Sequence, residues 1–182
     1  EPLLGGMVHV SVLHHATIEG ALAFRIAMKL SNGEMSDQIL REICDEAYAS
    51  DPWLARAARA DIRATFDRDP ACHRFLQPLL YFKGFQAVQT QRVAHWLWGQ
   101  GRWDLAFFFQ MRASELYGVD IHPAAEIGQG IMIDHAHSIV IGETAVIGDD
   151  VSLLQGVTLG GTGAERGDRH PKIGRGVLLG AG

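Results

Sequence analysis

Four of the nine histidines lie in the last third of the chain, at His122, His135, His137 and His170. Neutral imidazole, with a reference pKa of about 6.5, is the usual proton acceptor near neutral pH. Such a base needs a partner that orients its second ring nitrogen. Asp120 precedes His135 by fifteen residues, a spacing that permits contact between adjacent coils, and a cap at the domain junction is the alternative role. The pattern favours a general base at His135.

Other polar residues in the same region are suited to binding a small zwitterion. Arg169 could hold a carboxylate through a planar two-point contact, or it could be a solvated loop charge. Asp134 could bind an ammonium group, or it could replace the usual glycine of a corner. Both alternatives stay open on spacing alone.

A zinc site is the alternative reading of the histidines, since three imidazoles from neighbouring repeats could bind a metal. Their spacings match no local ligand motif, and neither Cys44 nor Cys72 joins them. We therefore expect no metal. The two cysteines also form no redox spacing, which favours buried thiols in a reducing, cytoplasmic compartment.

A six-residue repeat must position these residues. From Ile121 to the last residue, an aliphatic side chain recurs at every sixth position, often with glycine directly after it, and a second apolar residue stands two positions earlier. Residues at spacing two share one face of a strand. Such a short repeat predicts a parallel β-helix, with glycine turning each corner. Its hand does not follow from the pattern. The glycine pairs are Ile127-Gly128, Ile141-Gly142, Ile147-Gly148, Leu159-Gly160, Ile173-Gly174 and Leu179-Gly180.

The repeat loses its phase twice, and both interruptions carry histidine. Two residues are inserted around Asp134-His135, where the coil is expected to bulge outward. The polar, glycine-bearing stretch 162–171 reads as a loop that leaves the solenoid. Insertions in repeat proteins tend to be functional loops, so both interruptions are candidates for the site.

Residues 1 to about 118 show helical spacing instead. A long amphipathic helix is expected over 7–30, and Ser36 is expected to cap the next helix, to about Ser50. Asp51-Pro52 and Asp69-Pro70 both read as helix starts, with an N-cap aspartate before a proline.

The helical spacing continues through two more helices, over 85–99 and 103–117, and ends at Gly118. Aromatic residues gather in this part, either as a helix–helix core or as a subunit interface. The expected organisation is an α-helical domain over 1–118, followed by a β-helix over 119–182 that contains the loop 162–171.

The amino-acid composition limits the classes of binding partner that we expect. The chain of 182 residues has 47% hydrophobic residues and a net charge of −5, which argues against nucleic-acid binding. No apolar stretch is long enough to span a bilayer, so no membrane partner is expected. The chain begins at Glu1 and stops at Gly182 inside a repeat, and we expect it to be a fragment of a longer protein.

The motifs resemble one family closely. The run DIHPAAEIGQGIMIDHAHSIVIGETAVIG from Asp120, followed by VSLLQGVTLGGTG and GDRHPKIGRGVLLGAG, is similar to bacterial serine O-acetyltransferase. The helical segments DPWLARAARADI, DRDPA and PLLYFKGFQAVQTQRVAHWLWGQGR are similar to that family's N-terminal domain. The resemblance covers essentially the whole chain.

The resemblance implies a left-handed β-helix that trimerises, with the helical domains pairing trimers into a hexamer. It also implies transfer of acetyl from acetyl-CoA to the hydroxyl of L-serine by direct attack, with His135 as the base and Asp120 as its partner. Asp69, Asp134, Arg169 and His170 match the positions that hold the amino acid, so the helical domain would supply part of the serine site.

Further expectations follow from the same resemblance. Gly160, Gly161 and Ala181 match positions that line an acetyl-CoA groove between subunits. Cysteine would inhibit at the serine site, and O-acetylserine sulfhydrylase would bind a C-terminal tail of the full-length protein only. This chain, lacking the last coils and the tail, would then bind CoA weakly. His137 stands where the family has a small residue, and no role is assigned to it.

Three other functions compete with this one. A hexapeptide acetyltransferase for a sugar or antibiotic hydroxyl would share the base but would not need Arg169. A γ-type zinc carbonic anhydrase would use the histidines as ligands. A non-catalytic scaffold would only hold the sulfhydrylase.

Overall fold

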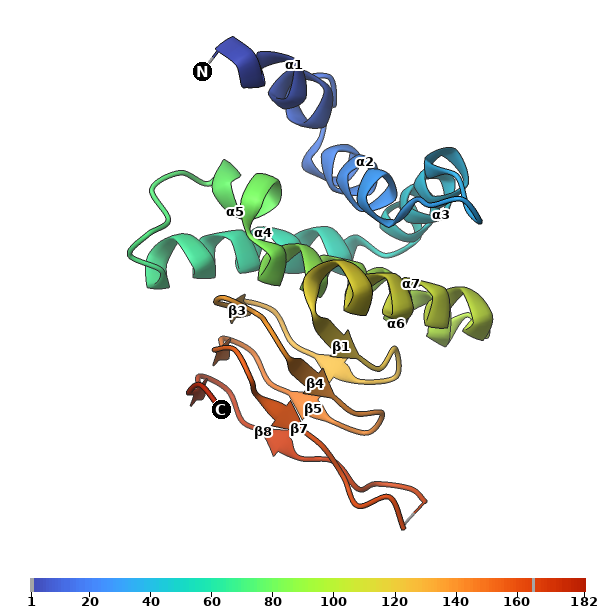
Figure 1. Ribbon diagram of the computed structural model, residues 1–182, viewed down its shortest axis with the longest axis vertical. Coiled ribbons are helices and arrows are strands. Elements are labelled where there is room, and N and C mark those ends of the chain that lie inside the picture. The colour runs from blue at the N-terminus through green and yellow to red at the C-terminus, as the bar shows by residue number, and fades with distance from the viewer. Residues whose placement is uncertain (1, 165) are drawn as a thin grey trace. The chain divides into compact units, whose positions relative to one another are not determined.

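The computed structural model describes residues 2–164 and 166–182 (Figure 1). Its contacts divide the chain into two compact units, Glu1–Ala55 and Arg56–Gly182. Within the described residues, every helix is too short or too polar to cross a membrane. The free thiols Cys44 and Cys72 are both buried, as expected.

The first unit is helical. The helix expected over 7–30 is wrong as a single element, because the segment at His14–Thr17 interrupts it. The side chain of Thr17 then accepts the N–H of Gly20 at 3.2 Å and starts a new helix. Ser36 caps the following helix, as expected, by accepting from Ile39 N–H at 3.4 Å. The elements are a 3₁₀ turn Pro2–Leu4, α1 (Gly5–Val8), a π-helical segment His9–Leu13, α2 (Ile18–Leu30) and α3 (Asp37–Ser50).

Four helices follow, of which the first begins before the boundary between the units. The expected start at Asp51-Pro52 is confirmed, since Asp51 Oδ1 accepts from Trp53 N–H at 2.9 Å. The expected start at Asp69-Pro70 is wrong. Asp69 instead closes a turn by accepting from Ala71 N–H at 2.8 Å. The helices are α4 (Pro52–Arg68), α5 (Leu76–Tyr81), α6 (Lys83–Gly99) and α7 (Trp103–Tyr117).

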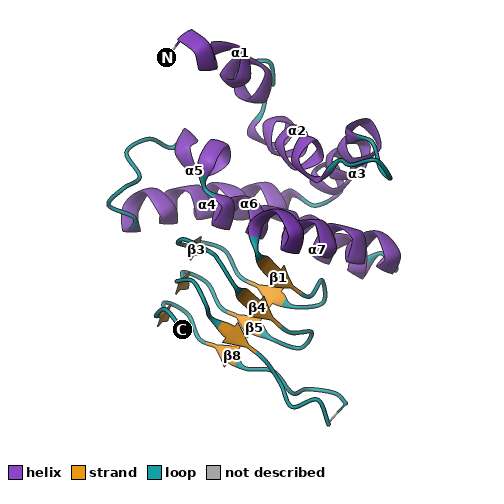
Figure 2. Ribbon diagram, viewed as in Figure 1, coloured by secondary structure: helices purple, strands orange, loops and turns teal. Residues whose placement is uncertain are grey.

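Gly118 marks the change from helix to strand. It takes the left-handed conformation with φ 66° and donates its N–H to Ser114 O at 3.0 Å, a common helix ending that favours glycine. The strands after it are very short and stack as the successive sides of coils (Figure 2). They are β1 (Val119–Ile121), β2 (Glu126–Ile127), β3 (Met132–Ile133), β4 (Ile139–Ile141), β5 (Val146–Ile147), β6 (Ser152–Leu153), β7 (Thr158–Leu159), β8 (Lys172–Ile173) and β9 (Leu178–Leu179).

The strands form three parallel sheets, ordered β1-β4-β7, β2-β5-β8 and β3-β6-β9. Each strand thus pairs with the strand that comes three strands later in the chain, which confirms a parallel β-helix. The hexad residues pair in register and stack as apolar columns, whose first two layers are buried. The columns are Ile121–Ile141–Leu159, Ile127–Ile147–Ile173 and Ile133–Leu153–Leu179.

The register confirms both interruptions of the repeat. Val119 pairs with Ile139, a separation of 20 residues, whereas Val140 pairs with Thr158 at 18. The two additional residues of the first coil lie in the corner between β3 and β4. The polar stretch 162–171, of which the structure describes residues 162–164 and 166–171, leaves the coil between β7 and β8.

The hexad glycines serve a different purpose from the expected one. The positive-φ positions in the stretch 128–156 are Gly130, Asp150 and Gly156, besides the β3–β4 corner, and not the glycines directly after the columns. Those glycines instead allow close approach between coils. A Cβ on Gly128 would lie 2.7 Å from the backbone nitrogen of Asp149.

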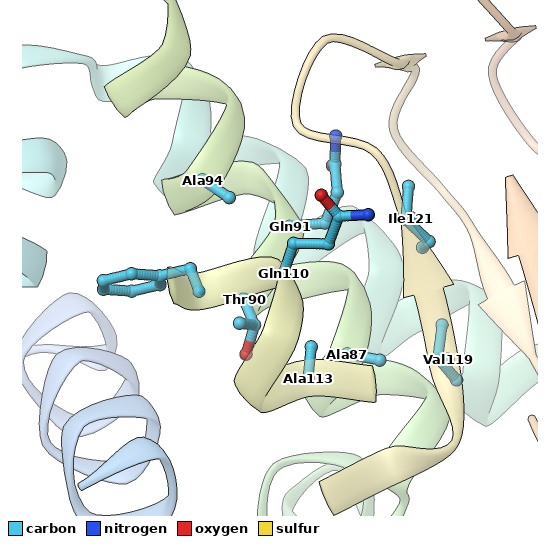
Figure 3. A pocket seen from close by; sticks show the side chains of 9 residues that line it. Ala87, Thr90, Gln91, Ala94, Gln110, Ala113, Val119 and Ile121 are labelled. Atoms are coloured by element: carbon cyan, nitrogen blue, oxygen red, sulfur yellow. The ribbon is translucent and has the colours of Figure 1, made fainter. Parts of the chain in front are cut away.

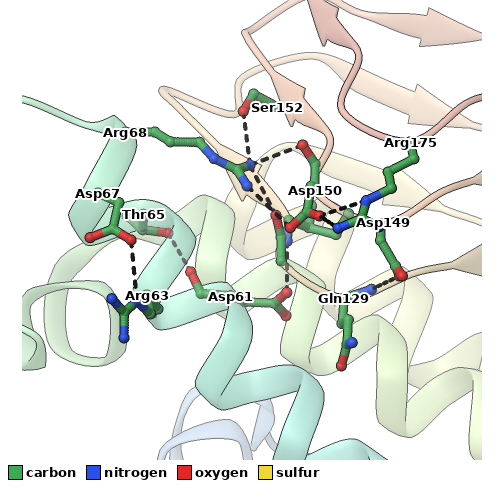
Figure 4. Close-up of polar contacts among 12 residues, drawn as sticks. Asp61, Arg63, Thr65, Asp67, Arg68, Gln129, Asp149, Asp150, Ser152 and Arg175 are labelled. Atoms are coloured by element: carbon green, nitrogen blue, oxygen red, sulfur yellow. Dashed lines mark hydrogen bonds and ion pairs between the residues drawn. The ribbon is translucent and has the colours of Figure 1, made fainter.

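A buried ion pair joins the helices to the first coil, and Figure 4 shows the Asp61 carboxylate among the neighbouring polar contacts. Arg92 Nη2 lies 2.7 Å from Asp61 Oδ2, and both side chains are almost fully buried. Arg92 also donates to the backbone oxygens of Ile127 at 3.2 Å and Gly128 at 2.8 Å. Asp61 Oδ1 accepts from Ile131 N–H at 2.8 Å. The ion pair therefore satisfies backbone groups on the outer edge of the first coil.

Two further side chains extend this coverage. Gln91 donates to Ala125 O at 3.0 Å, and Arg68 donates to Gly130 O at 3.0 Å. Arg68 also reaches the second coil, at Asp150 O, 3.1 Å away. An uncovered strand edge invites pairing with another chain, and helix side chains prevent this here.

Candidate active site

The corner between β3 and β4 presents His135 to solvent. His135, Ala136 and Ser138 have positive φ values of 57°, 65° and 58°. This conformation costs a non-glycine residue roughly 1–2 kcal/mol, and such strain concentrates at functional sites. The two inserted residues impose it, because the corner must bulge to hold them. The side chain of His135 is 71% exposed.

Asp134 braces this corner. Its N–H donates to Leu153 O in the next coil at 2.9 Å, and its Oδ1 accepts from His135 N–H at 2.8 Å. Its Oδ2 lies 3.4 Å from His135 Nε2. The carboxylate predicted to bind an ammonium group thus contacts the predicted base, and the two form one accessible pair.

Asp120 and His135 share no hydrogen bond in the described part of the chain. Asp120 lies in β1, where it pairs with Val140, and its Oδ1 accepts from Gln110 Nε2 at 2.6 Å. Gln110 comes from α7 and lines a small, mostly apolar pocket between α6, α7 and β1 (Figure 3). The role of Asp120 as the orienting partner stays a prediction.

Arg169 and His170 lie on the β7–β8 loop, which folds back onto Glu143 and Thr144. Arg169 Nη2 donates to Glu143 Oε2 at 2.8 Å. This hydrogen bond is the main cause that lowers the pKa of Glu143. The Thr144 hydroxyl accepts the backbone N–H groups of Arg169 at 3.0 Å and His170 at 3.2 Å, and lies 2.8 Å from His170 Nδ1. Both predicted substrate-binding residues are therefore fixed by the coil beneath them.

The two histidine-bearing regions occupy different corners of the triangular coil. His135 follows a strand of the β3-β6-β9 sheet and precedes one of the β1-β4-β7 sheet. Arg169 and His170 lie between the β1-β4-β7 and β2-β5-β8 sheets. The predicted base and the predicted carboxylate-binding residues are thus parts of two separate sites within one chain.

The remaining predicted site residues lie elsewhere. Asp69 is in the turn after α4. Gly161 lies against the loop, since a Cβ there would be 2.7 Å from Arg169 O. A Cβ on Gly160 would lie 3.3 Å from a methyl carbon of Thr158, and Ala181 is exposed. Gly161 is therefore required for loop packing, whatever its role toward a cofactor.

His122 and His137 differ in their surroundings. Burial beside the rings of Trp98 and Phe107 lowers the pKa of His122, and the carboxylates of nearby acids oppose this. His137 Nδ1 contacts Lys83 Nζ at the start of α6. Burial lowers the pKa of Lys83. In the described residues, no three His, Cys, Asp or Glu side chains are placed to hold a metal ion.

The sequence reasoning missed Glu143 and Thr144, which anchor the loop. A usable signal was present. Both follow Gly142 at the same corner from which the loop departs one coil later, after Leu159. Residues directly beneath an insertion are its natural contacts.

A β-helix of hexad repeats with polar corners is typical of the bacterial transferases of the hexapeptide-repeat type. A Brucella melitensis serine O-acetyltransferase of that description matches this chain at a TM-score of 0.95 and 49% sequence identity. The match covers 100% of this chain and 72% of that one. The family model for the N-terminal part of serine acetyltransferase matches residues 1–90. The Escherichia coli K12 serine acetyltransferase is 54% identical over 182 residues, which are 100% of this chain and 67% of the relative. The chain belongs to the serine acetyltransferase family.

Solved structures agree with this assignment and confirm the left-handed β-helix after a helical part. The Vibrio cholerae serine acetyltransferase matches with a TM-score of 0.98 and 54% identity, covering 100% of this chain and 70% of that one. The Neisseria gonorrhoeae enzyme in complex with serine matches with a TM-score of 0.97 and 50% identity, covering 100% of this chain and 74% of that one. A serine acetyltransferase in complex with cysteine matches with a TM-score of 0.96 and 53% identity, covering 98% of this chain and 74% of that one. A Brucella abortus complex with coenzyme A matches with a TM-score of 0.95 and 49% identity, covering 98% of this chain and 71% of that one.

Proposed function

We propose that the protein is an acetyl-CoA-dependent O-acetyltransferase that converts L-serine to O-acetylserine for cysteine biosynthesis. Relatives of near-identical fold have been solved with serine, with cysteine and with coenzyme A. The observation that carries the proposal is the exposed His135–Asp134 pair at the strained corner, within a chain 54% identical to a serine acetyltransferase.

His135 acts as the general base. It removes the proton from the serine hydroxyl while the oxygen attacks the thioester carbonyl carbon of acetyl-CoA. The tetrahedral intermediate then expels the CoA thiolate, which takes up from the imidazolium the proton removed from serine. A positioned base contributes about 10²–10⁴ in rate. Asp120, as proposed, orients the imidazole once the site is assembled, and Asp134 steadies it from the neighbouring position.

The amino acid is held by charge. Arg169 and His170 bind the carboxylate, and the carboxylates of Asp69 and Asp134 bind the ammonium group. Because His135 and Arg169 occupy different corners of one coil, a complete site requires a second copy of the chain. A homotrimer, or a dimer of such trimers, supplies one. We assign 1–118 to oligomerisation and part of the serine site, and 119–182 to acetyl transfer.

The acetyl-CoA chain lies, in this proposal, beside Gly160, Gly161 and Ala181 at the boundary between copies. A backbone N–H there is suited to stabilising the developing oxyanion. No metal takes part. L-cysteine competes with serine, from which it differs by sulfur for oxygen. O-acetylserine sulfhydrylase is the expected partner of the full-length family protein, in the cytoplasm.

Calorimetric titration with serine and cysteine, followed by assay of CoA release from acetyl-CoA and serine, tests the proposal. We expect both amino acids to bind at one competing site, and His135→Ala to lower the rate by about 10²–10⁴ while leaving serine affinity largely unchanged. Serine acetylation at a near-normal rate by the variant would overturn the mechanism. Acetylation of a sugar or antibiotic hydroxyl in preference to serine would overturn the substrate.

A further inference from the structure

We infer that Thr144 and Gly142 are positioning residues that fix His170 in its Nε2–H tautomer, so that His170 donates a hydrogen bond to the carboxylate of the bound amino acid. The identity of the acceptor rests on the proposed function. The tautomer rests on the geometry of this chain alone.

The hydroxyl of Thr144 lies at the centre of the contacts that hold His170. A hydroxyl has two acceptor lone pairs and one proton. The N–H groups of Arg169 and His170, at 3.0 and 3.2 Å, occupy both lone pairs. The proton is shared between two acceptors, His170 Nδ1 at 2.8 Å and the carboxylate of Asp168.

The backbone amide of Thr144 determines the tautomer of His170. The N–H of Thr144 points at His170 Nδ1 from 3.2 Å, and a backbone amide can only donate. Nδ1 must therefore accept. In neutral imidazole the proton then resides on Nε2.

Gly142 makes room for the ring in this position. A Cβ at Gly142 would overlap Nε2 and Cδ2 of His170. The φ of Gly142 is not positive, so alanine is compatible with its backbone, and the ring is the main obstacle. Gly174 offers a matched control, since it also follows a column residue, also lacks a positive φ, and has no atom within 4 Å of an added Cβ.

The arrangement divides two tasks between two histidines. His135 is exposed and has one neighbouring carboxylate, as a base requires. The amide of Thr144 occupies Nδ1 of His170, which leaves the neutral ring only its Nε2–H to offer. The adjacent Arg169 makes an anionic acceptor the natural ligand, because guanidinium and Nε2–H both seek carboxylate oxygens.

Nitrogen-15 NMR of histidine-labelled protein reads the tautomer directly, with His170 assigned from its loss in His170→Asn. We expect an unprotonated Nδ1 and a protonated Nε2 above pH 8, retained in Thr144→Ser. A protonated Nδ1 would overturn the inference whether or not the protein binds serine. If the tautomer is as expected but serine does not bind, the proposed function fails and the positioning role stands.

A double-substitution cycle tests the positioning. We expect Gly142→Ala and Thr144→Val each to weaken serine binding by about ten- to a hundredfold, with kcat changed much less. Thr144→Ser should restore affinity, and Gly174→Ala should change nothing. In the His170→Asn background, Gly142→Ala should have no further effect. Full additivity of Gly142→Ala and His170→Asn in their effects on serine affinity would overturn the inference, as would an unchanged serine affinity in Gly142→Ala.

Discussion

Two arginine–carboxylate pairs in the second unit use the same chemistry for opposite purposes. The Asp61–Arg92 pair has side chains 0% and 1% exposed, and its oxygens and nitrogens also satisfy the backbone of the first coil. The Glu143–Arg169 pair is 41% and 25% exposed and anchors a loop that carries predicted substrate-binding residues. The first pair has no remaining access to a ligand, whereas the second can exchange its partner for one.

The difference shows how burial decides what an ion pair does. Breaking a buried pair leaves an uncompensated charge, which is strongly destabilising. Exposed pairs contribute little to stability, about 0–1 kcal/mol, because water already solvates both partners. Stability should therefore depend on Asp61 and Arg92, and substrate affinity on Arg169.

The largest effect is expected from Asp61→Ala. It leaves the Arg92 guanidinium buried without its carboxylate, and should lower the free energy of unfolding by about 3–5 kcal/mol in urea titration. Asp67→Ala is the matched control on the same helix, where an exposed pair with Arg63 predicts a change below about 0.5 kcal/mol. Equal effects of the two substitutions would contradict the comparison.

The second-largest effect is expected from Arg169→Lys, on the affinity for serine. The ammonium of lysine cannot reproduce the planar two-point contact with a carboxylate, so serine affinity measured by calorimetry should fall by about tenfold. Stability should stay within about 1 kcal/mol of the original. Arg175→Lys, at an exposed arginine paired with Asp150, is the control and should bind serine normally. A stability loss as large as that of Asp61→Ala would remove the distinction between the pairs.

A smaller effect is expected from acid. Hydrogen bonds from Arg169 and Lys172 lower the pKa values of Glu143 and Asp168 in the folded protein. Carboxyls with a lowered pKa stabilise the loop above their unfolded-state values near pH 4, and this contribution disappears as the pH falls through the lowered values. The protection factors of loop amides, which correct hydrogen exchange for its intrinsic pH dependence, should therefore fall only in that acid range, and Glu143→Gln should weaken the dependence. A fall in protection already at pH 6 would contradict this assignment.

The smallest effect concerns His122. Burial lowers its pKa, so the unfolded chain takes up a proton first as the pH falls below about 6.5, and the fold loses stability there. His122→Asn keeps an acceptor for the N–H of Ala124, now bonded to His122 Nδ1 at 3.0 Å, but removes the titration. The urea midpoint of this variant should vary less between pH 7 and 5. An unchanged slope would assign the dependence to other groups.

The sequence could predict features that depend on periodicity. The hexad spacing determined the coil, its columns and both interruptions, because burial repeats with the backbone. The spacing could not predict which atoms bond across coils. Asp69-Pro70 matched a helix start yet closes a turn. For Thr144, the position beneath the insertion indicates contact with the loop, but not that its hydroxyl accepts the N–H of Arg169. Contacts between separate segments, such as Asp120 with Gln110, leave no periodic trace.

The covered edge of the first coil also has a consequence for biosynthesis. The side chains that satisfy it, Asp61, Gln91 and Arg92, all precede the solenoid in the chain and leave the ribosome before it. A preformed row of donors and acceptors can thus select the register of the first turn of the solenoid as it emerges, and each later turn can copy the one before it. Helices α4 and α6 would serve as a template for layer-by-layer growth.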